Sequence, residues 1–360
     1  MKNTFGESVA VTLFGESHGE MIGAVIDGLA PGIAIDEDFI RHQLSLRRPQ
    51  GKISTARVEA DEFSIVSGVF EGKTTGTPLC ILIPNTNTRS GDYTPNIPRP
   101  GHADFAAECK YNGYQDPRGG GHFSGRITAA LVAAGAIAIS ALRQKGILIG
   151  THISRLSNIV DRSFENYEAD LEALSDLTFP VLDAASGAAM REEIENAASD
   201  GDSVGGVLET AVIGIPTGVG EPWFDSVESV LSHALFSIPA IKGVEFGAGF
   251  AFAKMRGSEA NDAFRMQNGC IVTTTNNNGG INGGITNGMP IIFRCAVKPT
   301  PSIFQEQDSV DMKAKENVTL KLSGRHDPAI IHRARVVVDS ITALALCDLL
   351  ALRFGTDFLK

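Results

Sequence analysis

The chain has 360 residues, of which 43% are hydrophobic and 20% charged, and its formal net charge is −11. This composition supplies enough apolar side chain for a large buried core and excludes wholesale disorder. The acidic balance argues against a general nucleic-acid surface and against a surface that binds anionic membranes.

The first predicted elements are two strands, a loop between them and a helix. Val9–Leu13 and Met21–Ile26 are apolar runs of strand length, separated by a short loop that contains Gly, Ser and His. Asp36 predicts a helix N-cap, and Pro49 predicts the end of that helix. Arg47 and Arg48 would then lie in its last turn, where cations suit the helix dipole.

A long functional loop is predicted in the next part of the chain. Ser64–Phe70 and Pro78–Ile83 are typical of strands, and a helix is expected from about Ser124 to Lys145. The segment between them, roughly Asn85–His122, is longer than an ordinary connection. Because it carries aromatic, arginine and histidine residues, we interpret it as functional.

The second half of the chain mixes helices and strands without a Pro- or Ser-rich linker. Asp225 and Glu228 are typical of a capping box at a helix start. Asp327–Pro328 predicts the start of the last helix, which Gly355 ends. Further helices and strands are predicted at Phe164–Leu174, Asp183–Ala198, Val207–Ile215, Val244–Ala253, Pro290–Val297 and Asn317–Leu322, with a polar loop at Thr273–Gly288. We expect one domain over residues 1–360.

Several features predict a cytoplasmic protein in a reducing compartment. The longest apolar stretch, Ile127–Leu142, is shorter than the ~20 residues of a membrane span. The first residues, Met1–Gly6, lack an apolar signal-peptide region. The five cysteines form no Cys-x-x-Cys pair and no metal-ligand spacing with histidine, so we expect buried free thiols and no metal site.

Two loops carry histidines beside glycine. In Gly15–Gly19, His18 could transfer protons near neutral pH, although a turn with an incidental histidine explains the same residues. In Arg99–Asp104, Pro and Gly fix a turn, and Arg99 and His102 could face one ligand. A surface turn with solvated charges is the alternative for this second loop.

The segment Arg118–Arg126 is the strongest local candidate for a ligand-binding loop. Its three consecutive glycines allow a ligand to approach the backbone, and a helix N-terminus that favours anions follows. It is neither a Walker loop nor a dinucleotide-binding fingerprint. A merely flexible loop is the weaker alternative.

Three later segments have both functional and structural readings. Gly279–Gly284 suggests backbone close to a ligand, or a low-complexity surface loop. Lys298–Ser302 leaves a strand with a cation and two hydroxyls, which suit a phosphate or ring heteroatoms. Arg325–Pro328 contains a strong helix-start signal, and the neighbouring Arg and His keep a functional reading open.

Together these segments resemble one family. Their order and spacing are similar to those of chorismate synthases from Phe14 to the last helix. The resemblance implies conversion of 5-enolpyruvylshikimate 3-phosphate to chorismate by 1,4-elimination of phosphate, the last step of the shikimate pathway to aromatic amino acids. It implies a lyase that needs reduced FMN, an α+β fold in which antiparallel β-sheets sandwich a helical layer, and a homotetramer. NADPH is implied as a possible reductant, and an external flavin reductase as a possible partner.

The resemblance also assigns roles to individual residues. The catalytic residues would be His18, which assists the departing phosphate, His102, which hands a proton to the flavin, and Asp327, which works at flavin N5. The residues implied to bind the flavin are His122, Phe123, Ser124, Pro239, Ala240, Gly283, Lys298, Pro299, Thr300, Pro301, Ser302 and Arg325. Those implied to face the substrate are Ser17, Arg47, Arg48, Arg99, Arg126 and Arg333, and Arg47 and Lys52 lie near positions implied to bind NADP.

Two other functional classes remain at this point. A flavin oxidoreductase that uses NADPH directly would be favoured by a dehydrogenase fingerprint, and the sequence has none. A non-catalytic anion-binding or assembly protein would tolerate loss of the histidines. The phosphate and carboxylates of the implied substrate would need several arginines nearby, and the local arginine clusters supply them.

Overall fold

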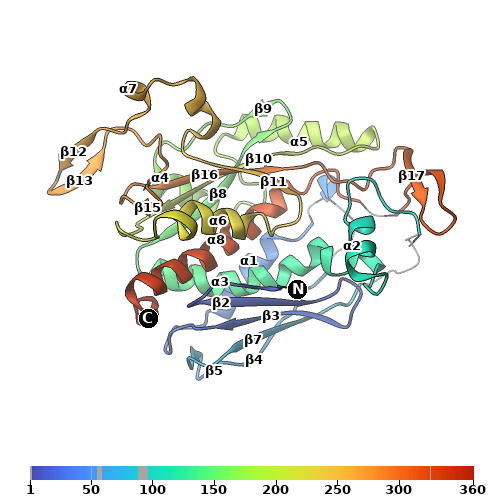
Figure 1. The fold of residues 1–360 in the computed structure, drawn as a ribbon, viewed down its shortest axis with the longest axis horizontal. Helices are drawn as coiled ribbons and strands as arrows, with labels where there is room; N and C mark the ends of the chain where they lie inside the picture. The colour runs from blue at the N-terminus through green and yellow to red at the C-terminus, as the bar shows by residue number, and fades with distance from the viewer. Residues whose placement is uncertain (1, 50, 55–58, 88–95, 325) are drawn as a thin grey trace.

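Two antiparallel sheets enclose a layer of helices (Figure 1). The structure is a computed structural model that describes residues 2–49, 51–54, 59–87, 96–324 and 326–360. Each main sheet has five strands, and one cluster of buried apolar side chains extends through both sheets and the helices between them. The predicted α+β class, with antiparallel sheets around a helical layer, is confirmed.

The N-terminal part of the chain forms the first sheet. Its strand order is β1–β2–β3–β7–β4, and all neighbours are antiparallel. In β7, Leu79, Ile81 and Ile83 are buried while the residues between them are partly exposed, as expected for a sheet that is covered on one face. The strands are β1 (Thr4–Phe5), β2 (Ala10–Gly15), β3 (Met21–Asp27), β4 (Ser64–Ser67) and β7 (Leu79–Pro84).

The second sheet is assembled from later segments of the chain. Its order is β11–β16–β10–β8–β9, again antiparallel throughout. In β16, Phe293 and Cys295 are fully buried and alternate with Arg294, which lies on the opposite face. The strands are β8 (Leu148–Leu156), β9 (Ile159–Val160), β10 (Gly206–Ile213), β11 (Ile241–Phe246) and β16 (Ile291–Val297).

Helices α3 (Thr128–Gln144) and α8 (Ile331–Phe354) form the centre of the sandwich, with α1 (Glu37–Leu46) beside them (Figure 1). The two central helices approach closely at Gly135. A Cβ atom there would lie 2.2 Å from the Cβ of Ser340, so only glycine permits this crossing. Both helices are buried along most of their length, which explains why their sequences are apolar on nearly every face.

The helical segment Gly125–Gln144 is long and apolar enough to cross a membrane. It is longer than the apolar stretch Ile127–Leu142 that was predicted from the sequence. However, 83% of its most apolar window is buried inside the protein. It therefore has the properties of the core helix of a sandwich fold.

Further helices and strands complete the fold, and α6 (Val227–Leu235) packs against α8 within the sandwich. The remaining α-helices are α2 (Asp104–Tyr111), α4 (Tyr167–Leu174), α5 (Ala184–Ser199) and α7 (Gly257–Ala260). The remaining strands are β5 (Val69–Phe70), β6 (Lys73–Thr74), β12 (Phe264–Gln267), β13 (Cys270–Thr273), β14 (Ile281–Asn282), β15 (Ile285–Thr286), β17 (Gln307–Asp311) and β18 (Glu316–Leu320). Short 3₁₀ helices occur at Gly51–Ile53, Arg118–Phe123, Gly125–Ile127, Trp223–Asp225, Gly249–Lys254 and Thr356–Leu359.

Several local predictions are confirmed and others are wrong. Asp36 caps α1 by accepting a hydrogen bond from the backbone N–H of Phe39, as predicted. The cap of α6 is Ser226 rather than Asp225, because the Ser226 hydroxyl accepts the N–H of Ser229. The long functional loop contains the unpredicted helix α2, and strand β8 was also missed.

The prediction that all five cysteines are buried is wrong for three of them, because Cys80 is only partly buried and two others are exposed. All five are free thiols, but Cys109 on α2 and Cys270 on β13 are exposed. Cys295 and Cys347 are buried, and burial raises the pKa of the Cys295 thiol to about 12. Cys109 lies in the segment that was predicted to be a long loop, and the hairpin strand that carries Cys270 was not predicted.

Candidate active site

The loop between β2 and β3 holds Ser17 and His18 against the triple-glycine segment. The Ser17 N–H donates to the Gly121 carbonyl at 3.0 Å, and the Asn85 side chain donates to the carbonyls of Glu16 and Gly19. Ser17 is fully buried and His18 is 8% exposed. His18 is therefore not in an open loop, because the glycine segment covers it.

The triple-glycine segment brings the two candidate catalytic histidines close together. Gly119, Gly120 and Gly121 all have positive φ angles, of 62°, 83° and 53°. A Cβ on Gly119 would lie 2.5 Å from His18 Nε2, and one on Gly120 would lie 3.3 Å from His102 Cε1. The backbone of adjacent glycines thus contacts one histidine each, and any larger residue would push against the rings.

His102 belongs to a compact charged unit with Arg99 and Asp104. Its Nδ1 lies 2.5 Å from Asp104 Oδ1, and Arg99 contacts both carboxylate oxygens at 2.8 Å. Burial raises the pKa of Asp104, but the hydrogen bonds from Arg99 and His102 outweigh burial and hold that pKa well below its usual range. Arg99 is thus bound to an internal carboxylate, and Asp104 is a residue of the site that the sequence analysis did not assign.

The Lys298–Ser302 segment lies against this unit. Lys298 Nζ donates to the Gly101 carbonyl, and Arg99 Nη1 lies 3.4 Å from Ser302 Oγ. Ser203 Oγ donates to the Thr300 carbonyl at 2.7 Å. Thr300 Oγ1 is buried and has no hydrogen-bond partner among the described residues. Pro299 and Pro301 are part of the same segment, and a Cβ on Gly101 would contact Pro301.

Asp327 lies next to the same region but does not cap the last helix. Helix α8 begins at Ile331, and Arg333 Nη1 donates to both Asp327 oxygens at 2.8 and 2.9 Å. The prediction of an N-cap is therefore wrong, because the carboxylate pairs with an arginine of the first helical turn. The Val204 N–H donates to the Pro328 carbonyl, so Ser203 and Val204 connect this segment to Thr300. Arg325 lies outside the described residues.

Two of the predicted substrate arginines are buried in an internal ion-pair cluster. Arg126 pairs with Asp61 and donates to the Asn85 side chain, while Arg47 Nη1 lies 3.5 Å from the second oxygen of Asp61. The Asp61 side chain is 1% exposed. Because α1 ends at Leu46, Arg47 lies just past the helix rather than in its last turn.

Arg47 and Arg48 differ in their surroundings. The Arg47 side chain also donates to the Gly125 carbonyl, and the backbone carbonyl of Arg47 accepts a hydrogen bond from the Arg333 side chain. Arg48 donates to the Ala60 carbonyl, but its Nε is shielded from solvent and has no hydrogen-bond partner among the described residues. The side chain of Lys52, near Arg48 in the sequence, is outside the described part of the structure.

The other residues expected to bind the flavin do not all lie together. His122 Nδ1 donates to the Gly15 carbonyl at 2.8 Å, and the Phe123 ring contacts Tyr111 edge-on. The Ser124 hydroxyl accepts the Arg126 N–H and caps the short 3₁₀ helix before α3. Of the three, His122 contacts the end of β2 that leads into the His18 loop.

Pro239, Ala240 and Gly283 lie at opposite ends of α6. Pro239 and Ala240 follow its last turn, and the Lys298 N–H donates to the Ala240 carbonyl at 3.0 Å. Gly283 precedes Gly284, whose carbonyl accepts the N–H of Val227 at the first turn. A nine-residue helix is about 13 Å long, so a single chain does not bring Gly283 to Lys298. Figure 1 shows β15, just after Gly283, far from α2.

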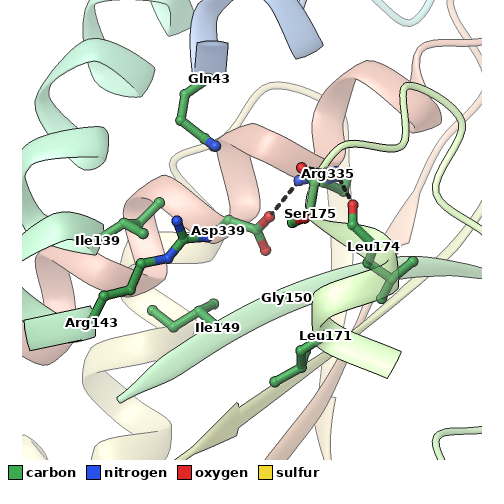
Figure 2. Close-up of a pocket in the computed structure, with 10 residues that line it drawn as sticks. All are labelled: Gln43, Ile139, Arg143, Ile149, Gly150, Leu171, Leu174, Ser175, Arg335 and Asp339. Atoms are coloured by element: carbon green, nitrogen blue, oxygen red, sulfur yellow. Dashed lines mark hydrogen bonds and ion pairs between the residues drawn. The ribbon is translucent and has the colours of Figure 1, made fainter. Parts of the chain in front are cut away.

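A separate small cavity lies between α1, α3, α4 and α8 (Figure 2). Its volume of about 20 Å³ has room for about one water molecule. Arg143, Arg335 and Asp339 line it, and Arg335 bonds both Asp339 and the Leu174 carbonyl. Burial raises the pKa of Asp339, and the nearby arginines and Thr151 oppose that rise. None of the predicted site residues lines this cavity.

The geometry of the site indicates a class of enzyme. Two histidines face adjacent glycines, Arg99 contacts His102 and Lys298 contacts the neighbouring Gly101. The described residues contain no cluster of three or more His, Cys, Asp or Glu suited to a metal ion. This arrangement is typical of a site that moves protons on a small anionic ligand.

Comparisons with known proteins agree with one another. A family model described as chorismate synthase matches residues 9–351. Curated chorismate synthases from Thermococcus kodakarensis and Thermococcus gammatolerans are 45% and 47% identical to this chain over 345 residues, which cover 95% of this chain and 96% of each relative. The chorismate synthase of Pyrococcus abyssi is 46% identical over 351 residues, 97% of both chains. A solved crystal structure of chorismate synthase superposes with a TM-score of 0.76 at 28% identity, over 97% of this chain and 93% of that chain.

The chain therefore belongs to the chorismate synthase family, as the sequence motifs indicated. It is an enzyme of the lyase class.

Proposed function

We propose that this enzyme converts 5-enolpyruvylshikimate 3-phosphate to chorismate by 1,4-elimination of phosphate, in the last step of the shikimate pathway. The observation that carries the proposal is the contact of Gly119 and Gly120 with His18 and His102, beside Arg99 and Lys298. A leaving phosphate needs its growing charge neutralised, and a 1,4-elimination also removes a proton, so cations and proton-transfer groups must converge.

The binding of an anionic substrate is supported by Arg48. Its Nε is a buried donor with no partner among the described residues, which costs free energy unless a ligand accepts from it. Arg126 and Arg47 instead hold Asp61, next to the Ala60 carbonyl that Arg48 binds. Arg126 also binds Asn85, which donates to the Glu16 and Gly19 carbonyls beside Ser17, so we assign this cluster the role of fixing the segments that carry Arg48 and Ser17. Arg99 and Arg333 add positive potential beside the internal carboxylates that they bind.

The residues present also fit a bound flavin. Thr300 Oγ1 is a buried hydroxyl without a partner among the described residues, and the Lys298–Ser302 segment around it presents a cation and a further hydroxyl. Lys298, Thr300, Ser302, Ala240 and His122 would hold reduced FMN, which supplies electron density to the substrate when bound. Gly283 stays a prediction, because a second copy of the chain would have to bring it to this site.

The chain's own residues have separate tasks in this proposal. His18, packed against Gly119 and Ser17, donates a proton to the departing phosphate. His102, on the other side of the loop, holds and transfers a proton at the flavin side through its Nε2. Asp327, fixed by Arg333, orients polar groups near flavin N5.

Assembly and supply of reduced flavin are also part of the proposal. A homotetramer is supported by the β12–β13 hairpin, where Phe264, Met266 and Ile271 are exposed on one face of a two-stranded element that is only marginally stable alone. NADPH, directly or through an external flavin reductase, would reduce the flavin, and we place the enzyme in the cytoplasm.

The experiment is anaerobic turnover with photoreduced FMN, in which phosphate and chorismate are quantified together. We expect one phosphate for each chorismate, no stoichiometric consumption of reduced FMN, and no turnover with oxidised FMN. Turnover without any reductant would refute the flavin requirement. Consumption of one reduced flavin for each product would favour a flavin oxidoreductase instead.

A further inference from the structure

We propose that Asp104 is a positioning residue that sets the ring orientation and the tautomer of His102. In the proposed function, on which this inference rests, His102 transfers a proton through Nε2. The hydrogen bond between Asp104 and Nδ1 would hold the other ring nitrogen toward the Gly119–Gly120 loop.

The contacts of the Asp104 carboxylate are unusually complete. It accepts hydrogen bonds from His102 Nδ1 at 2.5 Å, from Arg99 Nε and Nη2 at 2.8 Å each, and from the Arg99 backbone N–H at 3.0 Å. Both oxygens are used, and the side chain is only 21% exposed. A carboxylate fixed by so many donors cannot rotate freely, so it can fix the ring that it binds.

The protonation of the ring follows from the chemistry of its neighbours. Asp104 has a pKa well below its usual range, because the hydrogen bonds from Arg99 and His102 outweigh burial, so it is ionised at neutral pH. An ionised carboxylate only accepts hydrogen bonds, which requires the proton on Nδ1. Arg99 Nη2 lies 3.0 Å from Nδ1 and 3.2 Å from Nε2, so this contact does not select between the two nitrogens. Because Asp104 requires the proton on Nδ1, Nε2 carries the lone pair in the neutral ring.

The orientation of the ring places Nε2 at the loop. A Cβ on Gly120 would lie 3.3 Å from His102 Cε1 and 3.4 Å from Nε2, so this edge of the ring faces the glycine backbone. Arg99 extends the same unit to Ser302. In the Ser-His-Asp triad, a carboxylate in this position holds the histidine in one tautomer and stabilises its protonated form during proton transfer.

A simpler role for Asp104 predicts a different outcome. Asp104 is the first residue of α2, where an acidic side chain suits the helix dipole. If that were its whole contribution, its replacement would lower stability and leave the tautomer of His102 and the catalytic rate constant unchanged.

The test combines ¹⁵N NMR of the histidine rings with kinetics on the full-length enzyme, reconstituted with photoreduced FMN. His102→Gln identifies the His102 resonances, and the parent protein should show the Nδ1–H tautomer. Asp104→Asn should shift His102 toward the Nε2–H tautomer, lower kcat by about 100- to 10,000-fold and change KM for the substrate by less than about threefold. Asp104→Glu should recover part of the kcat.

Asp170→Asn is the matched control. Asp170 also pairs with an arginine, Arg162, and accepts backbone N–H groups, but it contacts no histidine among the described residues. It should lose stability and keep the parental kcat.

Two results would overturn the inference. The first is an Nε2–H tautomer of His102 in the parent enzyme. The second is an Asp104→Asn variant whose His102 keeps the parental tautomer and whose kcat equals that of Asp170→Asn. Failure of the proposed function looks different. His102→Gln with parental turnover would remove His102 from the reaction while the Asp104-dependent tautomer persisted.

Discussion

Replacing Gly119 with alanine tests the contact on which the candidate site depends. The added Cβ would lie 2.5 Å from His18 Nε2, 2.6 Å from His18 Cδ2 and 3.0 Å from Ser17 Oγ. Ordinary contacts are about 3.5 Å, so the His18 ring must move by roughly 1 Å. A misplacement of that size costs about 100-fold in rate, and the positive φ of 62° adds about 1 kcal/mol of backbone strain. Turnover with prereduced FMN and the melting temperature measure the two effects separately.

Gly72→Ala is the control for Gly119→Ala. Gly72 has a similar φ of 73°, but a Cβ there would meet nothing within 4 Å. It should therefore show comparable backbone strain with parental turnover. If Gly119→Ala lost no more activity than Gly72→Ala, the packing of the loop against His18 would have no part in catalysis.

Four further predictions follow from the same geometry. Arg48→Ala should weaken substrate binding by about ten- to a hundredfold in equilibrium titration, and unchanged affinity would refute the arginine pocket. Arg126→Ala should lower the free energy of unfolding by about 3 kcal/mol in urea, because it leaves the buried Asp61 carboxylate with a weaker partner, and parental stability would contradict the ion-pair cluster. Asp327→Asn should cost at most about 1 kcal/mol of stability and slow turnover sharply, whereas an unchanged rate would leave it only as the partner of Arg333. His332→Gln should reduce the loss of stability as pH falls from about 6.5 to about 3. Burial lowers the pKa of His332 in the folded state to about 3, so the unfolded state binds the proton first as the pH falls. Acid therefore destabilises the parent more than the variant. Parallel stability curves of parent and variant would contradict that reasoning.

Most of the regular structure could be predicted because local pattern and tertiary environment agree. Buried and partly buried residues alternate in β7, which lies in a sheet covered on one face, and Asp36 caps α1 where its sequence signal predicted a helix start. Strand β8 was missed because its threonine and histidine interrupt the apolar run, yet they are buried by partners from distant segments. Thr151 bonds Asp339, and His152 bonds Asp161 and Glu209. Short helix α2 was missed because its amphipathic pattern is weak and one buried residue, Ala107, carries its packing.

The site could be predicted where glycines indicated a close approach to the backbone, but not where charged residues far apart in the sequence form ion pairs. Three consecutive glycines predicted a backbone that a ligand can approach closely, and the structure places the side chains of His18 and His102 against two of them. Arg126 was predicted to face the substrate, but its partner Asp61 lies 65 positions away, and no local pattern joins them. Asp104 was visible in the same motif as His102, two residues on, and the spacing alone did not reveal that its carboxylate binds both His102 and Arg99.

The rate of phosphate release by His18→Ala and His102→Ala, each with prereduced FMN under anaerobic conditions, tests the central claim most directly. Both variants should bind the substrate and melt near the parental temperature, yet release phosphate about 100- to 10,000-fold more slowly, because general acid–base groups contribute that much. A near-parental rate in either variant would contradict the claim that the histidines on the two sides of the Gly119–Gly120 loop carry the reaction.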